Sequence, residues 1–133
     1  MRRGTATPEA ILGLAVLVMV LVGAFALAQA LAAVWGVQRA AEAALQEVRL
    51  RGAGADPESA ARAALSGTPL LPLDPSGPAV AVAVDPPDPS AWRFGARVCL
   101  SVSADWTAGG GLLPPRDLSI SAVRCGFVEA WPP

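Results

Sequence analysis

The chain has 133 residues, a formal net charge of −1 and no histidine. This length suits one small domain. A charge this close to neutral argues against nucleic-acid binding, and the lack of histidine excludes Ser-His and Cys-His catalytic arrangements. We therefore expect a protein that is not an enzyme, with no cofactor, no metal and no small-molecule substrate.

An uncharged segment runs from residue 10 to residue 38. As a helix it would measure about 43 Å, against a hydrocarbon core of about 30 Å, so it is long enough to cross a bilayer. The alternative is a cleaved secretory signal, with Arg2 and Arg3 as its basic region and Ala-Gln-Ala at 28–30 as its cleavage site. The apolar run exceeds the length of a usual signal and the helical pattern continues past it, so we favour a retained anchor.

Beyond the apolar run the pattern becomes that of an amphipathic helix, with two faces at three- and four-residue spacing. The apolar face comprises Val34, Val37, Ala41, Leu45 and Val48, and the polar face comprises Arg39, Glu42, Gln46 and Arg49. The last three polar residues are spaced for pairing along the helix. Trp35 lies where an interfacial aromatic residue is expected, and Gly52 and Gly54 are expected to end the helix.

Glu9 lies at the start of the apolar segment. On chemical grounds alone it marks the head-group boundary, where the helix dipole favours an acidic residue, and Pro8 suits the first helical turn. The arginines on the two sides of the segment are nearly balanced, so orientation is inferred from the size of the two flanks. The short N-terminal flank has nothing to translocate, which predicts a single-pass protein with a cytoplasmic N-terminus and an extracytoplasmic C-terminal domain.

The opening residues, Arg2-Arg3-Gly4-Thr5-Ala6-Thr7-Pro8-Glu9, resemble the start of type IV pilin-like precursors, most closely the TadE-like proteins of tight-adherence systems. In that family a short basic leader ends in Gly, Glu is the fifth residue after the cleavage site, and a long apolar helix follows. The resemblance implies that a prepilin peptidase cleaves between Gly4 and Thr5. It also implies that Glu9 acts in assembly by pairing with the amino group of a neighbouring pilin-like subunit, because an unpaired carboxylate in lipid is costly.

Three later segments are also similar to that family. Residues 39–44 and 60–65 look like the Ala/Arg helices that follow its anchor, and residues 118–124 look like its final strand. The resemblance therefore implies the same order of elements along the chain.

A short helix is expected after the anchor, with Asp56 as its cap, Pro57 at its first position and Gly67 at its end. Its apolar face is mostly alanine, which predicts light packing against the long helix or the sheet. Residues 68–78 contain four prolines and are expected to form an extended connector.

The C-terminal part has the alternation of β-strands. Residues 79–84 form a short apolar run, and from Trp92 to Trp106 the even-numbered residues are apolar while most odd-numbered ones are polar. Residues 109–111 (Gly-Gly-Gly) and 114–115 (Pro-Pro) are expected to form a loop before a last strand around Leu118, Ile120 and Ala122.

Cys99 and Cys125 fall in two of these strands. A metal site would need more ligands, and a catalytic thiol would lack an imidazole partner. A disulfide is the favoured interpretation and would suit an oxidising exterior, contributing about 3 kcal/mol to stability. Cys99 lies on the polar side of its strand, so the bond is expected on the open face or an edge of the sheet.

The sequence thus predicts an α+β, pilin-like fold divided into residues 1–4 (leader), 5–52 (transmembrane and amphipathic helix), 53–78 (short helix and connector) and 79–133 (exported domain of about three strands). The expected function is that of a TadE-like pilin or pseudopilin, with the membrane, similar subunits and prepilin peptidase as partners. The alternative is a membrane-tethered envelope binding module that does not polymerise.

Overall fold

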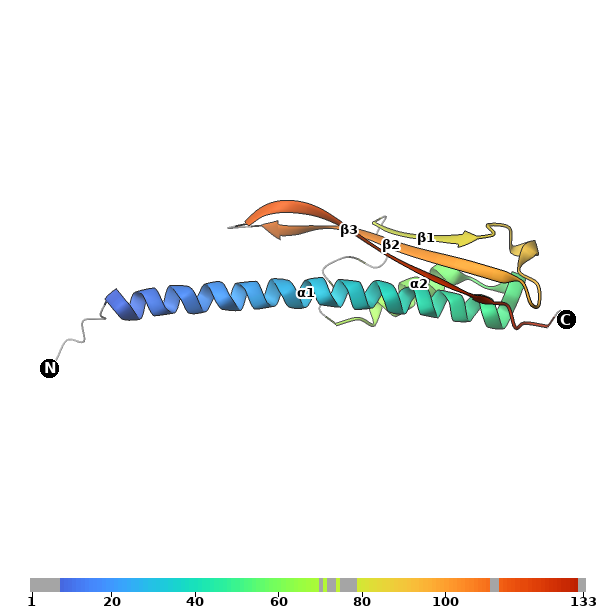
Figure 1. Cartoon of the computed structure of the whole chain (residues 1–133), viewed down its shortest axis with the longest axis horizontal. Coiled ribbons are helices and arrows are strands. Elements are labelled where there is room, and N and C mark those ends of the chain that lie inside the picture. Colours follow the sequence, from blue (N-terminus) through green and yellow to red (C-terminus); the bar gives the residue numbers. More distant parts are fainter. Residues whose placement is uncertain (1–7, 70, 72–73, 75–78, 111–112, 132–133) are drawn as a thin grey trace.

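The computed structural model describes residues 8–69, 71, 74, 79–110 and 113–131. It has an α+β fold in which a three-stranded antiparallel sheet and a short helix pack against the C-terminal half of one long helix (Figure 1). The N-terminal end of the long helix extends beyond the sheet and the short helix (Figure 1). The predicted fold class is confirmed.

Helix α1 spans Pro8–Arg51 as one continuous element of 44 residues. The run of leucine, alanine and valine favours this length, and a helix this long measures about 66 Å. The helix ends at Arg51. The next residue, Gly52, has a φ of +56°, which is costly for other residues, and begins the 3-10 helix η1, Gly52–Gly54. Of the expected helix 5–52, residues 5–7 lie outside the described residues.

Helix α2, Pro57–Ser66, begins and ends as the sequence predicts. The Asp56 side chain accepts a hydrogen bond from the Ser59 backbone N–H at 3.1 Å, and Pro57 occupies the first turn. Gly67 closes the helix through its backbone N–H. The helix packs along α1, with Ala61 and Leu65 fully buried.

The sheet has the order β1-β2-β3, formed by β1 (Val80–Asp85), β2 (Arg97–Gly110) and β3 (Leu113–Phe127). Val102 of the central strand lies between Val82 and Ala122. The predicted alternation in β2 is confirmed from Val98 onward, because its inner residues are buried in the core that the sheet shares with the two helices: Val98, Leu100, Val102 and Ala104.

The central strand begins later than the alternation predicts, at Arg97 instead of Trp92. Asp88 caps a short 3-10 helix, η2 (Pro89–Ala91), and Gly95 has a φ of +78°, so this segment turns. Trp92 is only 5% exposed, and its indole Nε1–H donates to the Pro86 carbonyl at 2.8 Å. The apolar periodicity at this residue reflects burial in a turn.

The expected glycine- and proline-containing loop is also shorter than predicted. β2 extends to Gly110 and β3 begins at Leu113, with a register shift between Ala108 and Gly110. Long antiparallel pairing keeps the backbone groups of both strands satisfied, and proline is tolerated on an edge strand such as β3. Most of the connector 68–78 lies outside the described residues.

Among the described residues, two ion pairs join the sheet region to α1. Arg124 in β3 lies 3.4 Å from Glu42, measured from Nε to Oε1, and Arg49 pairs with Glu129 after the end of β3. The spacing of Glu42, Gln46 and Arg49 suggested pairing along the helix, but Glu42 and Arg49 pair across to the sheet region instead. These contacts fix the direction of β3: it runs alongside α1 in the same direction.

Candidate functional site

The N-terminal half of α1 is bare. Its large hydrophobic side chains are all at least half exposed: Ile11, Leu12, Leu14, Val16, Leu17, Val18, Met19, Val20, Leu21, Val22, Phe25, Leu27 and Leu31. A single-chain protein in water does not leave so continuous an apolar surface uncovered. Among the described residues, the helical stretch Pro8–Gly54 is the one candidate long and apolar enough to cross a membrane.

Burial along α1 begins with the partly buried residues 28–30, and the first buried residues are Ala33 and Gly36. A Cβ atom on Gly36 would lie 3.1 Å from Leu71 Cδ1 and 3.3 Å from Thr68 Cγ2, so the chain after α2 crosses α1 closely at this point. On another side of the helix Trp35 remains 68% exposed. Its position at the change from bare to covered helix is that of an interfacial tryptophan.

Glu9 lies in the first turn of α1 and is exposed. Its carboxylate is favourably placed with respect to the helix dipole. Gly4 and Thr5, the residues of the expected processing site, lie outside the described residues. Their spacing to Glu9 is known from the sequence.

Small residues interrupt the bare half of α1. A Cβ atom added at Gly13 or Gly23 would meet nothing within 4 Å, so the backbone is accessible at both positions. Accessible glycines let another helix approach the backbone closely. The bare half thus offers an apolar surface with local recesses suited to a helical neighbour or to lipid.

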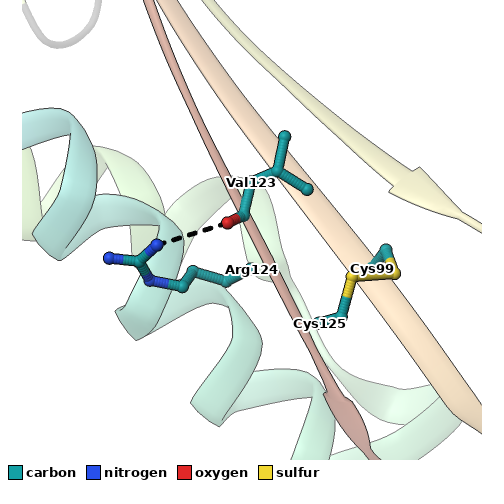
Figure 2. Close-up of a disulfide and its surroundings, with 4 residues drawn as sticks. All are labelled: Cys99, Val123, Arg124 and Cys125. Atoms are coloured by element: carbon teal, nitrogen blue, oxygen red, sulfur yellow. Dashed lines mark hydrogen bonds between the residues drawn. A yellow bond between two sulfur atoms is a disulfide. The ribbon is translucent and has the colours of Figure 1, made fainter.

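Cys99 and Cys125 form a disulfide between directly opposite residues of β2 and β3, with a Cα–Cα distance of 4.0 Å (Figure 2). Both lie on the face of the sheet opposite the buried valines, because their parity in the strand is that of the outward residues. The predicted bond is confirmed and lies on the open face of the sheet. In the same region the Arg124 guanidinium donates to the Val123 carbonyl at 3.4 Å (Figure 2).

The described part of the chain contains no group of three or more His, Cys, Asp or Glu side chains that could hold a metal ion. Its carboxylates are used structurally instead: Asp56 and Asp88 cap helical turns, Asp117 accepts from Thr107 at 2.8 Å, and Glu42 and Glu129 pair with arginines. These carboxylates hold turns, strands and the long helix together.

One feature of the far end was not anticipated from the sequence. Phe94 and Trp131 stack with ring centroids 4.4 Å apart, and both side chains are more than half exposed. They lie at the end of the sheet away from the bare helix. Their separation along the sequence left no local pattern that would have paired them.

No family model matches the chain, and comparisons with curated proteins and with solved structures return no match.

Proposed function

We propose that the chain is a TadE-like pilin or pseudopilin subunit that is anchored in a membrane by α1 and takes part in assembling a tight-adherence or type IV-like pilus or secretion apparatus. One observation carries the proposal: a single uninterrupted helix is bare and apolar over one half and packed under its own domain over the other. A subunit of this form can be stored in a membrane and later packed into a helical bundle without refolding.

The exposed apolar half of α1 must be covered both in the membrane and in an assembly. Exposed apolar surface costs about 25 cal/mol for each Å², so a row of leucines and valines of this length is strongly driven out of water. Lipid satisfies it in the membrane, and the equivalent helices of other subunits satisfy it in an assembly. The accessible backbone at Gly13 and Gly23 supports the second possibility, because small residues permit close helix contact.

Glu9 distinguishes the two proposals, because an assembling subunit needs this carboxylate and a simple membrane anchor does not. A carboxylate at the start of an apolar helix becomes costly once the helix enters a packed bundle. Pairing with the amino group that cleavage after Gly4 would create on a neighbour offsets this cost. The leader, the carboxylate and the helix thus form a consistent set.

The second candidate is a tethered envelope binding module that does not polymerise. The stacked and exposed Phe94 and Trp131 favour it, because exposed aromatic residues are common anchors of binding surfaces. Such a module needs neither processing nor Glu9.

The intact mass of the protein purified from its native membrane tests the processing step. The proposal expects loss of residues 1–4, and Gly4→Leu should block this loss. A mass that retains Met1 to Gly4 would contradict the processed-pilin proposal. Loss of about thirty residues would instead identify an ordinary signal peptide.

The assembly step is tested with Glu9→Ala, compared with the matched change Glu58→Ala on the exposed face of α2. We expect Glu9→Ala to be cleaved and inserted normally but to be lost from sheared surface fibres or from cross-linked subunit complexes, while Glu58→Ala assembles as the wild type does. Equal assembly of the two variants would favour the non-polymerising module.

A further inference from the structure

The β2–β3 hairpin extends beyond the third strand of the sheet. β1 pairs with β2 only as far as Val80 and Ala104, whereas β2 and β3 continue as a two-stranded ribbon. We call this ribbon, residues 106–110 and 113–118, the overhang. It extends toward the N-terminal end of α1 and lies at the level of the bare half of the helix (Figure 1).

The contacts between β3 and α1 locate the overhang along the axis of α1. Arg124 lies beside Glu42, and a strand advances about 3.3 Å per residue against 1.5 Å in a helix. Leu118 therefore lies up to about 20 Å nearer the N-terminal end, roughly level with Gln29. Arg116 lies up to about 26 Å nearer, within the stretch of α1 that is bare.

The overhang does not fit inside the hydrocarbon core. No third strand among the described residues pairs with this ribbon, and the backbone groups left unpaired along its edges are not tolerated in lipid tails. Residues 8–32, the part of α1 before its first buried residue, measure about 37 Å as a helix, which exceeds the core thickness of about 30 Å. A tilt of α1 of about 30° reduces the membrane thickness that residues 8–32 span. If the tilt raises the side of α1 that carries the sheet, the overhang lies in the head-group layer.

The described side chains on the inner face of the overhang are of the types found at membrane interfaces. Trp106 and Leu118 are direct partners across β2 and β3; Trp106 is partly buried and Leu118 is 40% exposed. Arg116 has the same parity and is exposed, and it makes no ion pair with another described residue. Tryptophan prefers the head-group level, and arginine can reach lipid phosphates while its stem stays in the apolar region.

We propose that the overhang is a second membrane contact, in which Trp106, Leu118 and Arg116 rest in the outer head-group layer beside α1. The inference relies on the membrane anchorage in the proposed function but not on polymerisation. Its occupant is the lipid surface because the overhang is continuous with a domain whose anchor enters that surface next to it. The contact would fix the tilt and rotation of α1 in the membrane.

Tryptophan quenching in vesicles tests the contact with the full chain. The vesicles contain phosphatidylcholine and phosphatidylglycerol, with bromine atoms near the head group or near the end of the acyl chains. Trp92 is buried and is kept in every variant as a common background. Three double variants then leave one further tryptophan each: Trp106 (Trp35→Phe with Trp131→Phe), Trp131 (Trp35→Phe with Trp106→Phe) or Trp35 (Trp106→Phe with Trp131→Phe).

We expect the shallow bromines to quench the variant that keeps Trp106 at least two-fold more than the variant that keeps Trp131, which reports the far end of the sheet. Equal quenching of these two variants, with Trp35 still quenched, would overturn the overhang contact and leave the anchor intact. An unquenched Trp35 would instead overturn the anchorage itself. A Trp106 signal that changes only as the protein-to-lipid ratio rises would assign the overhang to a second copy and overturn the lipid contact.

Arg116→Glu provides a second variant that preserves the tryptophans. Reversing this charge should reduce the quenching of Trp106 in anionic vesicles by about half. The matched change Arg97→Glu, at the other end of β2, should leave it unaltered. An equal effect of both changes would contradict a local contact of Arg116 with the head groups.

Discussion

Gly126 of β3 lies directly against Leu45 of α1. A Cβ atom on Gly126 would come within 3.3 Å of Leu45 Cδ2 and 3.4 Å of Arg49 Cδ. The sheet approaches the helix closely here because one partner has no side chain. The ion pairs Arg49–Glu129 and Glu42–Arg124 flank this contact along α1.

Gly126→Val should therefore destabilise the domain by about 1–3 kcal/mol, because the added methyl groups must displace Leu45 or move the strand. The measurement is chemical unfolding of the full chain in detergent micelles, followed by tryptophan fluorescence. Gly54→Val is the matched control, since a Cβ atom at Gly54 meets nothing within 4 Å. Similar losses for both variants would point to a general effect of valine and not to the helix–sheet contact.

The disulfide should stabilise the domain by an amount similar to the loss expected for Gly126→Val. It joins residues 26 positions apart, and cross-links of this size typically stabilise by about 2–4 kcal/mol. Reduction of the wild type and the double change Cys99→Ser with Cys125→Ser should lower the unfolding free energy by similar amounts. The double variant should not respond further to reductant; a further loss would show that the reductant acts elsewhere.

The local elements of this fold were predictable because each has a signal within a few residues. Asp56, Pro57 and Gly67 define α2 by capping chemistry, and the inward residues of β2 are the apolar ones. The two cysteines were expected in two of the strands, and they are register partners. Periodicity, caps and cysteine count are all properties of short stretches of sequence.

The errors concern long-range pairing. Trp92 continues the alternation of β2 but is buried in a turn, since apolar parity cannot distinguish a strand from a turn that faces the core. Gly110 and Pro114 were expected in a loop, yet Gly110 pairs with Leu113 and Pro114 lies within β3, in a ribbon whose length is set by the pairing of the two strands. Glu42 and Arg49 had candidate partners on their own helix, and only the position of the sheet region selects Arg124 and Glu129.

The turn before β2 should be sensitive to acid through Asp88. Hydrogen bonds from the Ser90 side chain and backbone hold the pKa of Asp88 below its usual 3.8. Because the pKa is lower in the folded state, the stabilisation is present above the unfolded pKa and is lost as pH falls through the folded one. The carboxylate is fully exposed, so we expect a small loss below about pH 4.

Asp88→Asn tests this effect. The variant should be slightly less stable than the wild type at neutral pH and should lack this component of the acid response, because its amide does not titrate. Unfolding followed by tryptophan fluorescence as a function of pH measures both. Asp105→Asn is a control at an exposed position on the same sheet. An acid response unchanged by Asp88→Asn would show that other carboxylates account for it.

The contact between the two helices depends on small side chains, and α2 contains a matched pair that tests it. Ala61 is fully buried in the same core cluster as Ala40 and Ala44 of α1, whereas Ala63 of the same helix is exposed. Light packing was expected from the alanine content of α2, but complete burial means that the two backbones approach closely. Leucine has a helix propensity close to that of alanine, so Ala→Leu at the two positions differs mainly in the space available.

Ala61→Leu should cost about 1–3 kcal/mol because the buried site has no room for three more carbon atoms. Ala63→Leu should change the unfolding free energy by less than about 0.5 kcal/mol. Unfolding in micelles again provides the measurement, and helical circular dichroism checks that α1 remains intact. If Ala61→Leu were as stable as Ala63→Leu, α2 would be able to move away from α1 without loss, and the close packing of the two helices would not be what holds this domain together.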